Sequence, residues 1–135
     1  MTIPLGPTPG VGAVIVEHDH VLLIRRGSGA LVGQWAVPGG HQRFGETMRE
    51  AVAREVREET GLEVEVGEVV WAGDAIGPGD PPAWHFTLVD FEARRTGGEL
   101  MAGDDATEVR WVDLSEAIAL PLPDSMHYLL GVLRV

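Results

Sequence analysis

Three glutamates, Glu55, Glu58 and Glu59, are spaced three and four residues apart in the sequence. On a helix, this spacing brings their carboxylates to neighbouring positions on one side. Carboxylate oxygens are the ligands that Mg²⁺ and Mn²⁺ prefer, whereas zinc sites commonly include Cys or His. Because the chain has no Cys and no His adjoins the cluster, the residue types favour Mg²⁺, with Mn²⁺ as a substitute.

The position of this cluster, in the last turn of a predicted helix, is costly without a counter-charge. Like charges three or four residues apart repel by about 0.2–0.5 kcal/mol per pair, and each opposes the helix dipole by about 0.3–1 kcal/mol. The alternative interpretation is a solvated acidic face, which is common for charge clusters. A divalent cation would remove these costs together, and Mg²⁺ shares its remaining positions with substrate phosphates. We therefore expect a phosphate-containing substrate.

The helix that carries the glutamates has start and stop signals. Thr47 can cap the first turn, with Glu50 completing a capping box, and Gly61 supplies a left-handed stop. The expected span is Met48–Thr60. One stripe of apolar side chains is predicted to face the core, namely Met48, Ala51, Val52 and Val56. Glu55 lies within the arc of this stripe, so the glutamate cluster should adjoin the core.

Short apolar and β-branched runs before and after this helix predict strands. The expected strands are Val11–Glu17, Val21–Arg26, Trp35–Val37, Leu62–Gly73, Trp84–Ala93 and Glu108–Val112. Turns are expected at 18–20 and at Gly39-Gly40, and a loop at Asp74–Pro82. Two further helices are expected, a short one from Asp113 and a terminal one over Asp124–Leu133. Strands without regular βαβ alternation indicate an α/β fold with a mixed sheet and helices on its faces.

The composition excludes several functions. The 135 residues suit one domain, spanning 1–135, and the formal net charge of -11 argues against stable binding to nucleic acid or to an anionic membrane. The absence of Cys and Lys excludes thiol nucleophiles, P-loop lysines and Schiff bases, and no serine lies in a G-x-S-x-G motif. No apolar run reaches a membrane-spanning length, and residues 1–10 lack the features of a secretory signal. The expected location, by default, is cytoplasmic.

The stretch Gly40–Leu62 resembles the signature of a known family. Its pattern, Gly40-x5-Glu46-x7-Arg54-Glu55-Val56-x-Glu58-Glu59-x-Gly61-Leu62, matches the Nudix box at every specified position. Upstream, Leu22–Arg26 and Trp35–Gly40 are similar to the MutT-type Nudix context, and the likeness extends loosely to Trp111 and Val112. The resemblance therefore covers most of the chain.

This resemblance implies a fold, an activity and a set of site residues. The Nudix fold is an α/β/α sandwich around a central mixed β-sheet. Nudix hydrolases use a divalent metal, usually Mg²⁺, to cleave a diphosphate linked to a nucleoside, which here implies a nucleoside monophosphate and a phosphorylated remainder as products. Glu55, Glu58 and Glu59 match the metal-binding and catalytic glutamates. Gly39 matches a glycine whose carbonyl often joins the metal site.

Two further residues of the box, Glu46 and Arg54, match an ion pair that braces the motif in similar proteins. The implied mechanism is in-line attack of an activated water on one phosphorus, a reaction that carboxylate-held metal ions support. The general base varies in the family and is either the first glutamate of the cluster or an acid from a later loop. Asp104, Asp105 and Glu108 are the candidates for that additional acid, and an acidic turn is the alternative interpretation of them.

Residues outside the box are candidates for substrate binding. Arg25 and Arg26 end a predicted strand, where alternation sends one side chain inward and the other outward. The resemblance implies that Arg26 contacts substrate phosphate or base, with Arg25 as a second candidate, whereas surface charge is the alternative for both. His85 is a further candidate, with a structural role as the alternative. The neighbouring Trp84 and Phe86 could stack on a base, although core packing is the commoner role of aromatic residues in such a strand.

Two classes of function remain open. The chain is most similar to the ADP-ribose pyrophosphatase-like and MutT-like members, which leaves ADP-ribose and nucleoside triphosphates as candidate substrates. Homodimers are common among similar proteins, but no interface is identifiable in the sequence. The alternative class is a non-catalytic Nudix module that senses a ligand or binds a protein. Such modules commonly lose box glutamates, whereas this chain retains them.

Overall fold

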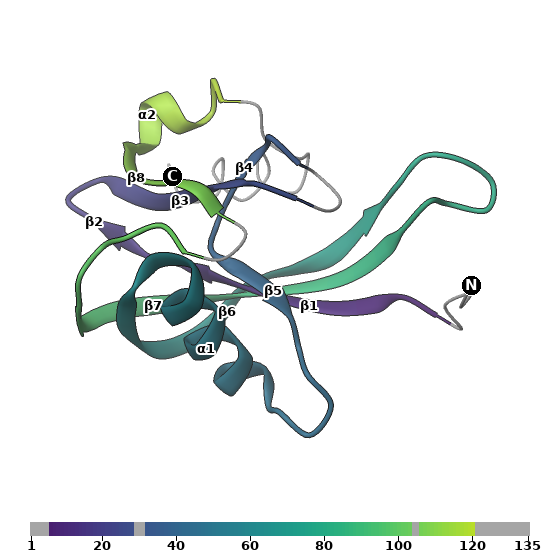
Figure 1. The fold of residues 1–135 in the computed structure, drawn as a ribbon, viewed down its shortest axis with the longest axis horizontal. Helices are drawn as coiled ribbons and strands as arrows, with labels where there is room; N and C mark the ends of the chain where they lie inside the picture. The colour runs from purple at the N-terminus through teal and green to yellow at the C-terminus, as the bar shows by residue number, and fades with distance from the viewer. Residues whose placement is uncertain (1–5, 29–31, 104–105, 121–135) are drawn as a thin grey trace.

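The computed structural model describes residues 6–28, 32–103 and 106–120 (Figure 1). In chain order the elements are β1 (Thr8–Val14), β2 (Val16–Glu17), β3 (His20–Arg26), β4 (Trp35–Ala36), β5 (Gly39–His41), α1 (Met48–Thr60), β6 (Leu62–Ile76), β7 (His85–Gly98), β8 (Ala106–Asp113) and α2 (Leu114–Ala117). The long helix α1 therefore lies between two groups of strands, as the sequence predicts.

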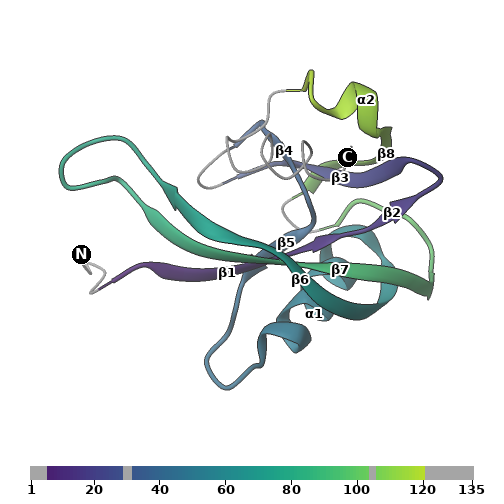
Figure 2. The same ribbon diagram turned by 180° about the vertical axis from the view of Figure 1, so that it is seen from behind.

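The strands form two sheets of different kinds. Sheet A has the order β5-β1-β7-β6, in which β1 and β7 run parallel and the other neighbours run antiparallel. Sheet B contains β2, β3, β4 and β8, and its pairs are antiparallel. The parallel pair makes sheet A mixed, which confirms the predicted α/β fold. Figures 1 and 2 show the long β6–β7 hairpin projecting from one end of the molecule.

The two helices lie on opposite sides of the sheets (Figure 1). Apolar side chains of α1 pack with both sheets in one buried cluster, which consists of Val11, Ala13, Ile15, Leu22, Ala51, Val52, Val56, Leu62 and Phe91. A second buried cluster includes α2 and consists of Val14, Val21, Leu23, Trp35, Val37, Val112 and Ala117. Neighbouring residues of β1 therefore enter different clusters, the alternation expected of a strand covered on both faces.

Helix α1 begins and ends at the predicted residues. The Thr47 side chain accepts a hydrogen bond from the Glu50 backbone N–H, and the Glu50 carboxylate accepts one from the Thr47 N–H, so the capping box is complete. Gly61 has a φ of 76° and ends the helix in the left-handed conformation. The first hairpin turn is also confirmed, because His18 and Asp19 both have positive φ, the conformation that tight hairpin turns favour.

Some element boundaries differ from the prediction. Gly39 and Gly40 do not form a turn; they belong to β5, which pairs with β1. A Cβ atom at Gly39 would lie 2.1 Å from the Val11 carbonyl oxygen, so glycine is needed there for a close approach of two strands. The predicted loop at 74–82 is also wrong at its start, because β6 continues to Ile76.

The buried face of α1 is shifted toward its C-terminal end. Met48 is 41% exposed, in contrast to the prediction, whereas Glu59 and Thr60 are buried. Thr60 satisfies its hydroxyl by donating to the Val56 carbonyl at 2.6 Å. The terminal helix predicted over Asp124–Leu133 lies outside the described residues.

Candidate active site

Arg54 lies at the centre of the acidic cluster. Its guanidinium binds both carboxylate oxygens of Glu46, with Nε donating to Oε2 at 2.6 Å and Nη2 donating to Oε1 at 2.9 Å. Nη1 donates to Oε1 of Glu55 at 2.8 Å and to Oε2 of Glu58 at 3.2 Å. Nη2 also donates to the His41 carbonyl at 2.9 Å, which ties α1 to the end of β5. A single side chain therefore positions several carboxylates and a strand end.

The pair formed by Arg54 and Glu46 stays charged at neutral pH. Hydrogen bonds from Arg54 lower the pKa of Glu46 to about 2, and the same contact raises the pKa of Arg54. A planar guanidinium can bind a carboxylate through two parallel hydrogen bonds, which a lysine cannot do. The ion pair expected at these two positions is present, and it orients the side chain that holds Glu55 and Glu58.

Glu59 turns away from Arg54 and is buried, with 3% of its surface exposed. Its Oε1 accepts a hydrogen bond from the Gly39 backbone N–H at 2.7 Å, and its Oε2 lies 3.5 Å from Nη1 of Arg26. Arg26 also donates from Nη2 to the Gly39 carbonyl at 3.3 Å. Gly39 is therefore held through both its N–H and its carbonyl, and the end of β3 is joined to the end of α1.

Gly40 leaves the space that the carboxylate of Glu55 occupies. A Cβ atom at Gly40 would lie 2.6 Å from Cδ of Glu55 and 2.7 and 2.8 Å from its carboxylate oxygens. A Cβ carbon does not approach non-bonded atoms this closely, so a larger residue at position 40 would displace the carboxylate. The first glycine of the box is thus explained by the position of its second glutamate.

The donors of this cluster fit a divalent cation in type and in charge. Glu55, Glu58 and Glu59 offer carboxylate oxygens and Gly39 a carbonyl oxygen, the hard ligands that Mg²⁺ and Mn²⁺ prefer. Acidic side chains also outnumber the arginines that contact them. Among the described residues, no three acidic or histidine side chains converge on one ion-sized site. Glu55 and Glu58 contact Arg54, whereas Glu59 contacts Arg26 and the Gly39 N–H. Metal binding would therefore require oxygens of these carboxylates to turn toward one ion.

The structure separates the two adjacent arginines outside the box. Arg26 reaches the cluster, whereas Arg25 is exposed and its Nη1 lies 3.7 Å from Oε1 of Glu108. Glu108 forms ion pairs with two exposed arginines, Arg25 and Arg110. Within the described part of the chain it has no contact with the glutamate cluster. Asp104 and Asp105 lie outside the described residues, so their role as an additional acid remains a prediction.

His85 lies in the β6–β7 hairpin, away from the cluster. Its Nε2 is 2.9 Å from Oδ1 of Asp74 on the neighbouring strand. Alternation along β7 places His85 on the same face as Val89 and Phe91, which belong to or pack against the α1 core cluster. The structure therefore gives His85 a partner within the hairpin, and its role in substrate binding remains a prediction.

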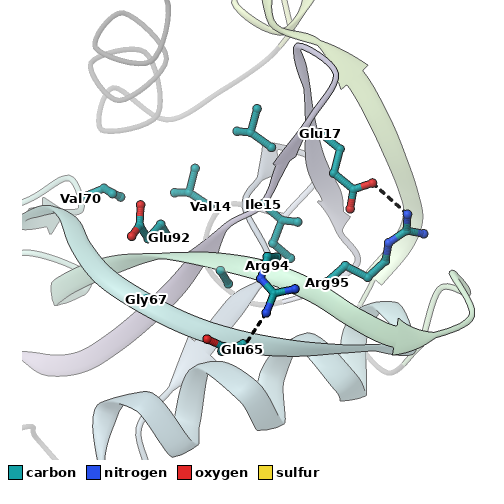
Figure 3. Close-up of a pocket in the computed structure, with 11 residues that line it drawn as sticks. Val14, Ile15, Glu17, Glu65, Gly67, Val70, Glu92, Arg94 and Arg95 are labelled. Carbon is teal, nitrogen blue, oxygen red and sulfur yellow. Dashed lines mark hydrogen bonds and ion pairs between the residues drawn. The ribbon is translucent and has the colours of Figure 1, made fainter.

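A cavity of about 510 Å³ lies elsewhere, between β2 and the strands β6 and β7 (Figure 3). Its arginines are already paired, since Nη2 of Arg95 lies 2.8 Å from Oε1 of Glu17 and Nη2 of Arg94 lies 2.8 Å from Oε2 of Glu65. No box glutamate lines this cavity. It therefore adds no group to the candidate active site.

Sequence reasoning assigned no role to His41, Arg43 or Asp90. His41 contributes its carbonyl, a group that every residue has, so no side-chain signal could identify it. Arg43 Nη2 lies 3.7 Å from Oε1 of Glu58, and its position within the box was the available signal. Asp90 is only 8% exposed in β7, and the signal was a single acid among the apolar residues of the segment LVDF.

The fold and the cluster together define a class of protein. It is an α/β protein in which one helix end presents arginine-held carboxylates to a glycine-bearing strand of a mixed sheet. The NUDIX domain family matches residues 6–130, which is most of the chain. The chain therefore belongs to the NUDIX domain family, as the box predicts.

Known proteins are similar to this chain in sequence and in structure. It is 40% identical over 111 residues to the ADP-ribose pyrophosphatase of Methanocaldococcus jannaschii, covering 82% of this chain and 64% of that protein. It is 33% identical over 123 residues to the 8-oxo-dGDP phosphatase NUDT18 of Homo sapiens, covering 88% of this chain and 35% of that protein. The chain thus spans less than two thirds of the length of either relative.

Solved structures include the same fold. The MutT NUDIX hydrolase of Burkholderia pseudomallei has a TM-score of 0.84 and 27% sequence identity to this chain, covering 93% of this chain and 97% of that one. This likeness confirms the α/β/α arrangement expected from the box. Over the residues that the structure describes, no helix has the length and apolar character needed to cross a membrane.

Proposed function

We propose that this chain is a Mg²⁺-dependent hydrolase that cleaves the diphosphate linkage of a nucleoside diphosphate derivative. The products are a nucleoside monophosphate and a phosphorylated remainder. The observation that carries this proposal is the cluster around Arg54, in which Glu46, Glu55 and Glu58 are held at one helix end. Such carboxylates suit a divalent cation, and a cation is what an acidic chain needs in order to bind a diphosphate.

The candidate substrates are ADP-ribose and nucleoside triphosphates. Both contain a nucleoside joined to a diphosphate, so one site can cleave the same kind of phosphoanhydride bond in either. The names of the relatives, an ADP-ribose pyrophosphatase and an 8-oxo-dGDP phosphatase, support substrates of this type. The shared diphosphate unit, and not the remainder of the molecule, is therefore the core of the proposal.

The metal would be held by Glu55, Glu58, Glu59 and the carbonyl of Gly39. When bound, Mg²⁺ supplies neutralisation of phosphoryl charge and an activated water. Mn²⁺ has the same preference for oxygen ligands and is expected to substitute.

The chain's own residues position the reacting groups. Arg54 keeps Glu55 and Glu58 in place, and Glu46 orients Arg54. In the reaction, a water oxygen forms a bond to one phosphorus, the bridging P–O bond breaks, and the water proton passes to a carboxylate oxygen, for which Glu55 is our candidate. Arg26 is the candidate for phosphate contact, because its guanidinium matches the geometry of phosphate oxygens.

Hydrolysis of a nucleotide panel tests this proposal. Wild type is incubated in Mg²⁺ with ADP-ribose, nucleoside triphosphates, dinucleoside polyphosphates and nucleotide sugars, and the products are identified by mass. Glu58→Gln removes one charge from the cluster and is expected to lower kcat by at least about 10-fold. Glu63→Gln is the matched control, because this exposed carboxylate is outside the cluster and lies 3.6 Å from Arg57.

The proposal fails if no member of the panel is hydrolysed or if Glu58→Gln is as active as wild type. A non-catalytic module that senses a ligand would then be the better account. A cytoplasmic location and a homodimer remain predictions.

A further inference from the structure

The face of sheet A that points away from α1 is rich in glycine. Paired residues on neighbouring strands share a face, and two successive rows on this face are Gly39, Gly12, Asp90 and Trp71, then His41, Gly10, Leu88 and Gly73. Alternate residues of the same strands, such as Val11 and Phe91, pack with α1 on the other face. Half of the positions in these rows are therefore glycine, and Asp90 supplies the acid among them.

Asp90 places a largely buried carboxyl in this face. The residue is 8% exposed, and burial raises the pKa of its carboxyl to about 6 without help from a charged neighbour. Among the described residues, no group forms a hydrogen bond or an ion pair with this carboxyl. The carboxyl oxygens are not among the fully enclosed side-chain atoms that lack a partner, so they keep some access to solvent, and a ligand that bears hydrogen-bond donors can reach them.

The carboxyl lies over β1, on the side toward β5. A Cβ atom at Gly12 would lie 2.3 Å from Oδ1 of Asp90 and 2.9 Å from Cγ2 of Val37. The Asp90 carboxyl therefore leans from β7 over β1 and lies near Val37. Gly12 pairs with Gly39 of β5, and neighbouring strands are about 5 Å apart. A diphosphate bound at the end of α1 can therefore extend its nucleoside over this face.

Aromatic rings border the same face. Trp71 is paired with Asp90 across β6 and β7. The ring of Phe86 has its centroid 5.6 Å from that of His41 and 5.6 Å from that of Trp84. Aromatic rings stack on planar heterocycles, and a carboxylate accepts hydrogen bonds from N–H groups. Both features suit a nucleobase better than a sugar or a phosphate.

We propose that Asp90 determines base specificity by accepting hydrogen bonds from the ring and amino N–H groups of guanine, an inference that rests on the proposed function. An ionised carboxylate has acceptor oxygens and no donor. Guanine presents a ring N–H beside an amino group, so its donors lie side by side. Adenine presents an amino donor beside an acceptor nitrogen, which an ionised carboxylate cannot satisfy. Among the candidate substrates, Asp90 therefore favours guanine nucleotides over ADP-ribose.

Binding of GMP and AMP, measured by calorimetry in Mg²⁺, tests this inference separately from hydrolysis, because neither nucleotide contains a diphosphate linkage to cleave. Wild type is expected to bind GMP more tightly than AMP. Asp90→Asn places an amide donor against the donors of guanine, so GMP affinity should fall by roughly 10- to 100-fold while AMP affinity changes little. Glu92→Gln is the matched control, because this acid is exposed on the same strand and should keep the preference for GMP.

Two further measurements separate recognition from folding. Gly12→Ala keeps the aspartate but pushes its carboxyl aside, and it should reduce the preference for GMP in the same direction. With a guanine nucleotide as substrate, Asp90→Asn should raise KM and leave kcat nearly unchanged, a split that general damage to the fold would not produce.

Equal effects of Asp90→Asn on GMP and AMP, or a wild type that prefers AMP, would overturn the inference. Its failure can be distinguished from failure of the proposed function. If no nucleotide is hydrolysed but GMP preference is lost in Asp90→Asn, the proposed function fails and the inference stands. If nucleotides are hydrolysed without any base preference, the inference fails and the proposed function stands.

Discussion

Replacement of Asp90 by Asn should change how the stability of the fold depends on pH. Burial raises the pKa of the Asp90 carboxyl from 3.8 to about 6 in the folded protein. Between these values the folded state binds more protons than the unfolded state, so the free energy of unfolding falls as the pH rises through this range. Below the lower pKa the carboxyl is protonated in both the folded and the unfolded state, so burial does not lower the free energy of unfolding. Above the upper pKa the carboxyl is ionised in both states, and the cost of burying its charge is present in full.

The size of this effect follows from the pKa difference. Each unit of difference corresponds to about 1.4 kcal/mol, so the ionised carboxyl costs the folded state about 3 kcal/mol at neutral pH. Asp90→Asn removes the titration. The free energy of unfolding of the variant, minus that of wild type, should therefore increase by about 3 kcal/mol between acidic and neutral pH.

Urea unfolding at a series of pH values measures this difference. The other carboxylates titrate in both proteins and cancel when the two curves are subtracted, and Glu92→Gln should show no such slope because Glu92 is exposed. A difference between Asp90→Asn and wild type that stays flat across the titration would refute the reasoning, because it would mean that the carboxyl is solvated or paired. Asp90→Asn is expected to gain stability at neutral pH and to lose discrimination between bases, a trade-off that is common at binding sites.

Three further sets of substitutions test the site and its scaffold. Gly40→Ala would place a methyl group 2.6 Å from the Glu55 carboxylate carbon; we expect kcat to fall on the order of 100-fold with little change in urea unfolding, and unchanged kinetics would contradict this. Arg54→Lys keeps the charge but loses bidentate binding, so kinetics and thermal melts should both show a loss; full activity would contradict the role given to the guanidinium. Gly61 and Gly45 both have positive φ, at +76° and +87°. The Cβ atom of Gly61→Ala would lie 2.3 Å from the Glu99 carbonyl oxygen, whereas the Cβ atom of Gly45→Ala would have no neighbouring heavy atom within 4 Å. Urea unfolding should show a loss of about 1 kcal/mol for Gly45→Ala and more for Gly61→Ala; equal losses would show that the clash adds nothing.

The sequence predicts α1 to the residue because its signals are local. Thr47, Glu50 and Gly61 act on backbone groups within one turn of the helix ends, so no knowledge of the rest of the fold is needed. The spacing of the box glutamates has the same local origin, since the helical period brings such residues together.

Strand β5 depends on contacts that local patterns do not contain. A short stretch with Gly39 and Gly40 is typical of a turn, and only pairing with β1 makes it a strand. The burial of Glu59 likewise depends on Arg26, which reaches it from the end of another strand. The argument from charge repulsion identified the acidic cluster, but it did not include the positive charge that the arginines place beside it.

Asp90 shows the same limit more sharply. Its environment depends on the parallel pairing of β1 with β7, which brings Gly12 under its carboxyl. Parallel pairing joins segments that are distant in sequence, so a lone acid in an apolar strand gives no indication of what lies beside it.

Binding of Mn²⁺, followed by electron paramagnetic resonance, tests the central claim most directly, because Mn²⁺ shares the ligand preference of Mg²⁺. The titration uses the full chain with a non-hydrolysable α,β-methylene nucleoside diphosphate. Wild type and Glu63→Gln should bind Mn²⁺ with the same affinity, whereas Glu55→Gln and Glu59→Gln should bind it at least about 10-fold more weakly. Equal Mn²⁺ affinity in all of these proteins would contradict the claim that the carboxylates at the end of α1 hold the catalytic metal.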